Sequence, residues 1–157
     1  MRHAKSSWSD ATLADFERPL NERGLRAGPF MGELMLKKGF CPAIILSSPA
    51  VRARATAELL QESGMLAAEI KFDHRIYEAS PHGLRQVVSE LDESITSAML
   101  VGHNPRIEGF IRFLTGQLEP MPTAALAVIN LEIDNWNVMD EGSGSLQRVY
   151  RPKEEMG

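Results

Sequence analysis

The chain has 157 residues, which suits one domain, because domains of about 100–200 residues are typical. Apolar residues make up 43% of the sequence and charged residues 24%, and these ordinary globular proportions exclude wholesale disorder. The net charge of −4 makes the protein a poor candidate for non-specific nucleic-acid binding, which depends on neutralising phosphates.

The sequence shows neither a disulfide framework nor a membrane segment. Cys41 is the only cysteine, so no intramolecular disulfide and no CxxC zinc pattern can form. No run of about 18 apolar residues is present, and no apolar segment follows Arg2 and Lys5 as it would in a secretory signal. We therefore expect a cytoplasmic protein that does not bind membranes.

The hydrophobic pattern predicts helices alternating with short strands. In chain order, we expect a loop or short helix at 9–18, helix 24–38, strand 43–46, helix 49–63, strand 70–72, helix 81–91, strand 98–101, helix 107–114, strand 126–133, and edge strands 136–139 and 146–150. The polar residues 151–157 are predicted to be a frayed tail. This alternation indicates a single α/β domain over 1–157, with a mostly parallel sheet in a three-layer α/β/α arrangement.

Polar side chains directly follow the predicted strands. Because ligands bind beyond the carboxyl ends of parallel strands, we expect three segments to meet there. These segments are residues 2–6, 47–52 and 102–105. They would bring Arg2, His3, Arg52 and His103 to one edge of the sheet.

These four side chains suit phosphoryl transfer. Arginine presents a planar fork of donors that matches phosphate oxygens. A neutral imidazole can act as a nucleophile at pH 7 and form a covalent intermediate. The residues alone therefore predict transfer of a phosphoryl group to a histidine, followed by hydrolysis.

Five blocks of the sequence resemble, in order, the motifs of the histidine phosphatase superfamily, which has the phosphoglycerate-mutase-like fold. They are most similar to the SixA-like phosphohistidine phosphatases within it. The blocks are residues 2–8 (RHAKSSW), 15–21 (DFERPLN) with Gly24, 46–53 (LSSPAVRA) with Thr56 and Ala57, 101–105 (VGHNP), and 121–124 (MPTA). The resemblance covers most of the chain, from Arg2 to about Leu131.

The resemblance implies a role for each matching residue. His3 would be the nucleophile that becomes phosphorylated, while Arg2 and Arg52 hold the phosphoryl oxygens and His103 donates to the phosphoryl group. Asn104 would line the pocket. The family implies a hydrolase that needs no cofactor and no metal.

Three further residues are weaker candidates. Lys5 and Ser6 are close enough in sequence to His3 to contact substrate, although a solvated loop is an equal alternative. Glu78 is the nearest candidate for a general acid, but SixA-like members are thought to work without a clear acid. A solvated loop carboxylate is the other interpretation of Glu78.

The chain departs from the family pattern before Arg2. In the family the Arg-His pair follows an apolar strand at the centre of the sheet, whereas here only Met1 precedes Arg2. Losing a central strand should be costly. Three explanations stay open: a start further upstream, a sheet completed in another way, or an impaired protein.

The leading hypothesis is a phosphatase for the phosphohistidine of a signalling or phosphotransfer protein. The alternatives are a phosphomonoesterase for a small metabolite, or a catalytically impaired module that binds phosphorylated partners. The chain has no long insertion that could close over the crevice, which favours a protein-borne phosphoryl group.

Overall fold

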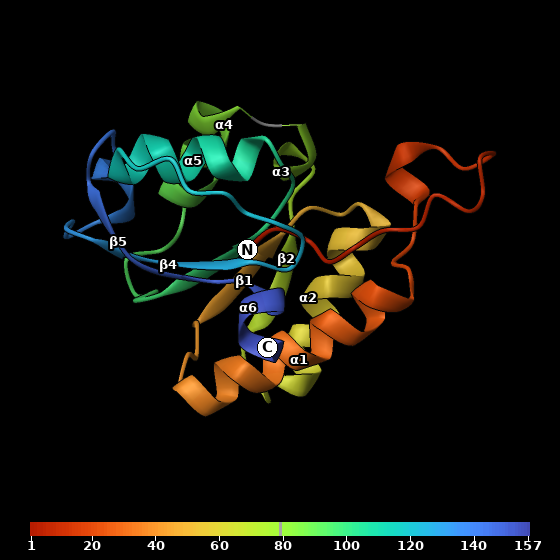
Figure 1. The fold of residues 1–157 in the computed structure, drawn as a ribbon. Coiled ribbons are helices and arrows are strands. Elements are labelled where there is room, and N and C mark those ends of the chain that lie inside the picture. The colour runs from red at the N-terminus through yellow and green to blue at the C-terminus, as the bar shows by residue number, and fades with distance from the viewer. Residues whose placement is uncertain (79) are drawn as a thin grey trace.

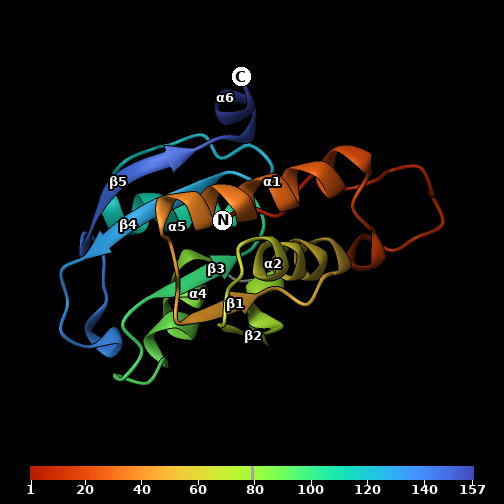
Figure 2. The ribbon, with the colours of Figure 1, turned by 90° about the horizontal axis from the view of Figure 1, so that it is seen from below.

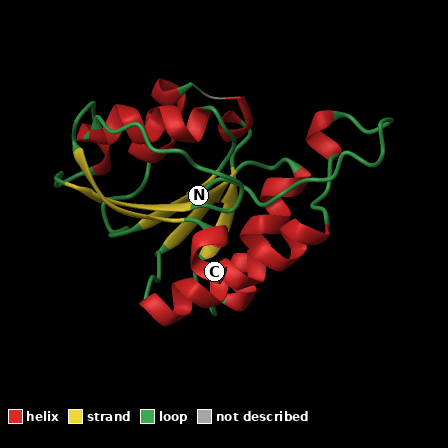
Figure 3. Ribbon diagram, viewed as in Figure 1, coloured by secondary structure: helices red, strands yellow, loops and turns green. Residues whose placement is uncertain are grey.

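The computed structural model describes residues 1–78 and 80–157, and its strands form two sheets (Figure 3). Three parallel strands, β1 (Ile44–Ser47), β2 (Glu69–Phe72) and β3 (Ala98–Val101), lie in the order β2–β1–β3. Strand β4 (Leu126–Leu131) pairs with β5 (Gly144–Tyr150) in antiparallel fashion. The predictions of a mostly parallel α/β fold and of an antiparallel strand near 146–150 are confirmed.

Helices cover both faces of the strands (Figure 1). Helices α1 (Glu22–Lys38) and α2 (Val51–Ser63) lie on one face, and α4 (Pro81–Ser89) and α5 (Arg106–Thr115) lie on the other. Side chains of β1 alternate between the two layers: Ile45 packs with the α1–α2 side, and Leu46 packs with the α4–α5 side. This alternation gives two hydrophobic cores, one on each face, as a three-layer arrangement requires.

The helix ends follow local chemistry. At the start of α1, the side chain of Asn21 accepts a hydrogen bond from the Gly24 N–H at 2.9 Å, as a helix cap does. The same helix ends at Gly39, whose φ of 75° suits glycine. A short helix, α3 (Arg75–Glu78), was not predicted. None of the described helices is long and apolar enough to cross a membrane.

Two predictions near the C-terminus are wrong. Residues 136–139, expected as a strand, contain the 3-10 helix η2 (Trp136–Val138), because the Trp136 indole N–H donates to the carbonyl of Ile95. The tail at 151–157, expected to fray, contains helix α6 (Pro152–Met156). Arg151, which precedes α6, forms an ion pair with Glu119 at 2.9 Å and so ties the tail to the body of the protein.

The first three residues connect the two sheets. On one side, the His3 N–H donates to the Gly102 carbonyl, and the Gly102 N–H donates to the Met1 carbonyl. On the other side, the Arg2 N–H donates to the Ala125 carbonyl, and the Ala124 N–H donates to the His3 carbonyl. The amino-terminal end therefore lies between β3 and β4 (Figure 2).

Helix α1 supports this segment through a close approach at Gly24. A Cβ atom at Gly24 would lie 2.2 Å from the backbone oxygen of Lys5. We predict that Gly24→Ala destabilises the protein by about 1–3 kcal/mol, because a rigid backbone must shift. Urea unfolding measures the change. Leu25→Ala is the matched control, since Leu25 is the next residue and is exposed, and equal stability of the two variants would contradict this packing.

Candidate active site

The structure brings His3, Arg52 and His103 together at the carboxyl ends of β1 and β3. The ring centroids of His3 and His103 are 5.0 Å apart. Arg52, on the first turn of α2, has its Nε 3.4 Å from Nε2 of His3. All three side chains are buried. Two imidazoles and a guanidinium thus share one small volume.

The ring of His3 is held in one tautomer. Its Nδ1 lies 2.7 Å from the backbone oxygen of Ala4. A carbonyl oxygen can only accept, so Nδ1 carries the proton and Nε2 keeps its lone pair. Burial, followed by the charges of Arg52, Arg2 and Arg18, lowers the pKa of His3 to about 4. At neutral pH this imidazole is uncharged, with its lone pair toward Arg52.

His103 follows β3 and contacts the residue that follows β1. Its Nε2 lies 2.7 Å from the hydroxyl of Ser48. Its Nδ1 is buried and has no hydrogen-bond partner in the described part of the chain. Burial, then the neighbouring His3 and Arg52, lowers the pKa of His103 to about 3. Ser48 was not singled out by the sequence, because its role depends on the adjacency of β1 and β3.

Arg52 is held by Asp15, which the sequence analysis did not single out. Two guanidinium nitrogens of Arg52 donate to Asp15: one to its backbone oxygen at 2.7 Å and one to its carboxylate at 2.9 Å. The same carboxylate accepts from the Tyr77 hydroxyl at 2.7 Å and from Arg18 at 3.0 Å. These bonds, with that of Tyr77 the strongest, lower the pKa of Asp15 to about 2. The carboxylate therefore stays charged and fixes the direction of Arg52.

Arg18 is a second arginine bound to Asp15. The sequence analysis did not name it as a site residue, although it lies in the block 15–21. Its guanidinium is buried, donates to Ser6 and Ser7, and stacks 3.2 Å from the ring centre of Trp8. No motif marks Tyr77, which reaches Asp15 across 62 positions of sequence. The block 15–21 was a sequence signal for Arg18, whereas only the tertiary fold could identify Tyr77.

The remaining candidates lie around this group. Arg2 donates to the Met121 carbonyl at 3.0 Å, and its Nε is buried without a partner among the described residues. Asn104 also donates to that carbonyl, at 2.9 Å. Ser6 is buried beneath Arg18, whereas Lys5 is half-buried and contributes its backbone oxygen to Asn21.

A cleft of about 320 Å³ opens above the cluster. The residues that line it are Asp15, Arg52, Tyr77, Glu78, His103, Asn104 and Arg106. Glu78 is exposed at this lining, and no hydrogen bond to its side chain is present in the described structure. Among the described residues, no three His, Cys, Asp or Glu side chains cluster as metal ligands do. The cleft is therefore lined by two guanidinium groups, two carboxylates and an imidazole, together with Tyr77 and Asn104.

The family can now be assigned. The sequence model of the histidine phosphatase superfamily (branch 1) matches residues 1–99. The chain belongs to this superfamily. It is a histidine-type phosphatase, and its fold is the phosphoglycerate-mutase-like one that the resemblance implied.

Individual relatives match nearly the whole chain. Protein ML1117 of Mycobacterium leprae is 30% identical over 168 residues, covering 98% of this chain and all of that protein. SixA from Agrobacterium tumefaciens superposes with a TM-score of 0.82 at 28% identity, over 97% of this chain and 95% of that one. A SixA protein histidine phosphatase complexed with tungstate shares the fold, with a TM-score of 0.80 at 22% identity. The match covers 99% of this chain and 96% of that one.

The low pKa values of His3 and His103 predict that the folded protein loses stability in acid. In the unfolded chain a histidine titrates near pH ~6.5, so on acidification the unfolded state takes up protons before folded His3 or His103 does. Stability conferred by each neutral imidazole is therefore present above pH ~6.5 and is lost as the pH falls toward 4. The unfolding free energy should fall between pH 7 and pH 5. We expect this fall to be about 2 kcal/mol smaller in His3→Gln than in the unsubstituted chain.

Urea unfolding at the two pH values measures this difference. His82→Gln is the control, because His82 is exposed on α4, away from the cluster. A pH dependence that is the same in His3→Gln as in the unsubstituted chain would contradict the buried, neutral state of His3.

Proposed function

We propose that this phosphatase removes the phosphoryl group from a phosphohistidine carried by another protein, through an intermediate in which His3 is phosphorylated. The observation that carries the proposal is the hydrogen bond from Nδ1 of His3 to the Ala4 carbonyl. It leaves the Nε2 lone pair as nucleophile beside the Arg52 guanidinium, 3.4 Å away.

In the first step, the lone pair of Nε2 forms a bond to phosphorus, and the P–N bond to the substrate imidazole breaks. The electron pair of that bond leaves with the substrate nitrogen, which solvent then protonates. Arg2 and Arg52 would bind the equatorial oxygens, where charge accumulates in the transition state. The unpartnered Nδ1 of His103 would donate to another oxygen, with the Ser48 hydroxyl donating to Nε2.

In the second step, a water oxygen attacks the phosphorus on His3. The P–Nε2 bond breaks, its electron pair returns to Nε2, and inorganic phosphate leaves with the water proton passing to solvent. Nδ1 keeps its proton in both steps, donating to the Ala4 carbonyl, so breaking the P–Nε2 bond regenerates the original tautomer. The cycle then begins again without any change in the protein.

Two features favour a protein-borne phosphohistidine over a small ester. The cleft is about 320 Å³ and its rim includes the exposed Glu78, so a phosphorylated side chain can reach it from outside. An imidazole leaves from phosphorus with less help from an acid than an alkoxide does, and Glu78 has no contact that orients it as an acid in the described structure. The SixA protein from Agrobacterium tumefaciens is named as a phosphohistidine phosphatase, which supports the same substrate class.

The nucleophile and the guanidinium can be tested directly. His3→Ala should abolish phosphate release from a phosphohistidine peptide, since no atom remains to accept the phosphoryl group. Arg52→Ala should lower kcat/KM at least about 100-fold, equivalent to about 2.7 kcal/mol of transition-state stabilisation. Release of inorganic phosphate is the readout, and His82→Ala should retain full activity. An active His3→Ala protein would contradict the intermediate, and tight phosphate binding without turnover in the unsubstituted protein would favour the binding module.

The substrate class is tested with a phosphohistidine peptide and an alkyl phosphate side by side. We expect the peptide to be hydrolysed at least about 100-fold faster in kcat/KM, because no positioned acid assists an alkoxide. Glu78→Gln should change neither rate more than about twofold. A comparable rate with the alkyl phosphate, together with a large loss of that rate in Glu78→Gln, would favour the small phosphomonoester instead.

A further inference from the structure

Three buried side-chain atoms lack a hydrogen-bond partner in the described part of the chain, and all three belong to candidate site residues. They are Nε of Arg2, Nδ1 of His103 and Oδ1 of Asn104. Leaving a buried polar atom without a partner is costly, so each such atom in a folded protein needs an explanation. Their gathering in one site indicates that groups of the reaction are their partners.

The atom of His103 is a hydrogen-bond donor. The Ser48 hydroxyl accepts from the Ala50 N–H at 3.2 Å, and among the described residues its one remaining partner is Nε2 of His103, at 2.7 Å. The single proton of this hydroxyl therefore points to Nε2, which must accept it. A neutral imidazole with an accepting Nε2 carries its proton on Nδ1, so Nδ1 matches a phosphoryl oxygen.

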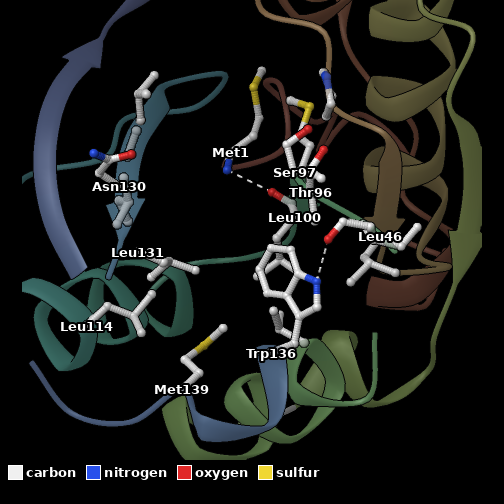
Figure 4. A pocket seen from close by; sticks show the side chains of 18 of the residues that line it. Met1, Leu46, Thr96, Ser97, Leu100, Leu114, Asn130, Leu131, Trp136 and Met139 are labelled. Atoms are coloured by element: carbon white, nitrogen blue, oxygen red, sulfur yellow. Dashed lines mark hydrogen bonds between the residues drawn. The ribbon is translucent and has the colours of Figure 1, made fainter. Parts of the chain in front are cut away.

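The atom of Arg2 is also a donor, and it is held in place. The Met1 amino group donates to the Leu100 carbonyl at 2.8 Å (Figure 4), and the Arg2 N–H donates to the Ala125 carbonyl at 3.1 Å. At the far end of the side chain, Nη1 donates to the Met121 carbonyl at 3.0 Å. With both ends of Arg2 fixed, Nε keeps one orientation as a second donor for phosphoryl oxygens.

The third atom, Oδ1 of Asn104, is an acceptor, and the nitrogen of the same amide fixes its orientation. Nδ2 donates to the Glu108 carboxylate at 2.8 Å and to the Met121 carbonyl at 2.9 Å. The Glu108 carboxylate is itself held, because it accepts the Met121 N–H at 3.0 Å. Turning the amide over would set Oδ1 against two oxygens that can only accept, so Oδ1 stays on the opposite side.

The partner of Oδ1 must be a donor, and a phosphoryl dianion offers no proton. Asn104 lines the cleft together with Arg52 and His103, where the reaction brings two donors. One is the water that attacks phosphorus, and the other is the ring N–H that a protonated substrate imidazole carries. That N–H lies on the far side of its ring from phosphorus, toward solvent, whereas Oδ1 is buried. A water molecule is small enough to reach a buried oxygen.

From the fixed amide, its buried oxygen and its place in the cleft, we propose that Asn104 is a catalytic residue of the second step, whose Oδ1 accepts a hydrogen bond from the attacking water. The inference rests on the proposed function and adds a residue to it. One O–H of the water donates to Oδ1, which directs a lone pair of the water oxygen to phosphorus, in line with the P–Nε2 bond of His3.

The chemistry of the step is otherwise unchanged. The P–O bond forms, the P–Nε2 bond breaks, and its electron pair returns to Nε2 of His3. A neutral amide is not a base, so the other proton of the water passes to solvent. Asn104 therefore contributes orientation alone, and it acts after the substrate imidazole has left.

Single-turnover mixing with a phosphohistidine peptide separates the two steps. Samples are quenched in alkali, in which phosphohistidine survives, and the phosphorylated enzyme is followed by intact mass. In Asn104→Leu we expect dephosphorylation of His3 to slow about 10-fold or more and its phosphorylation to change less than about threefold, so that phosphorylated enzyme accumulates. Asn130→Leu, exposed on β4, is the matched control and should behave as the unsubstituted chain. Equal slowing of both steps, or an unchanged second step, would overturn the proposal.

Asn104→Asp distinguishes the oxygen of the side chain from its anchoring nitrogen. An ionised carboxylate cannot donate to Glu108 and Met121, but it keeps an oxygen that accepts from water. We expect His3 to be dephosphorylated at least about threefold faster in Asn104→Asp than in Asn104→Leu. A residue that only anchored Met121 would make the aspartate variant as slow as leucine or slower, because the new carboxylate faces Glu108. That result would overturn the proposal.

Oxygen exchange between inorganic phosphate and water isolates the second step, because it runs that step backward and forward without a substrate imidazole. The protein is incubated with phosphate labelled with heavy oxygen, and loss of label is followed by mass spectrometry. Asn104→Leu should slow the exchange about 10-fold. Unchanged exchange with slow turnover of the peptide would show that Oδ1 acts on the imidazole, and would overturn the proposal. Exchange catalysed by His3→Ala would instead contradict the proposed function, and this inference with it.

Discussion

The backbone pairing of residues 1–3 holds the two halves of this protein together. Gly102 binds this segment from β3, and Ala124 and Ala125 bind it from the start of β4. Because His103 directly follows Gly102, the same pairing that joins the sheets also sets the two imidazoles 5.0 Å apart. A defect in this pairing would therefore disturb the fold and the site together.

A second set of bonds transmits the position of this segment to Arg52. The Ala4 N–H donates to the Thr56 hydroxyl at 2.9 Å, and that hydroxyl donates to the Arg52 carbonyl at 2.7 Å. The distance between His3 and Arg52 is thus fixed by backbone and buried side chains. Asp15 holds the guanidinium from the opposite side, and an incoming phosphoryl group must compete with this carboxylate for its donors. The competition favours a dianionic phosphoryl group over weaker anions.

The sequence predicted what depends on local patterns and on strand topology. Apolar runs located β1 and β3, apolar residues at helical spacing located α1, and the rule for strand ends led to Arg52 and His103. The sequence could not predict local structure that depends on contacts between residues far apart in the chain. Trp136 bonds to Ile95 and turns an apparent strand into a 3-10 helix, and Arg151 bonds to Glu119 and orders an apparent tail. Asp15 lies in a block that resembles a family motif and Tyr77 in none, and the hydrogen bond between them exists only after folding.

The paired amino-terminal segment and the proposed nucleophile form one mechanical unit. His3 lies two residues from the amino group of Met1, which donates to the Leu100 carbonyl at 2.8 Å. The first residues of a chain normally fray unless they are paired on both sides. Phosphoryl transfer in line tolerates only small displacements of the attacking atom. The bonds of residues 1–3 to Gly102, Ala124 and Ala125 oppose such fraying, and they restrict the motion of Nε2 relative to Arg52. A change that weakens these bonds should therefore lower catalytic rate along with stability, because one set of hydrogen bonds determines both.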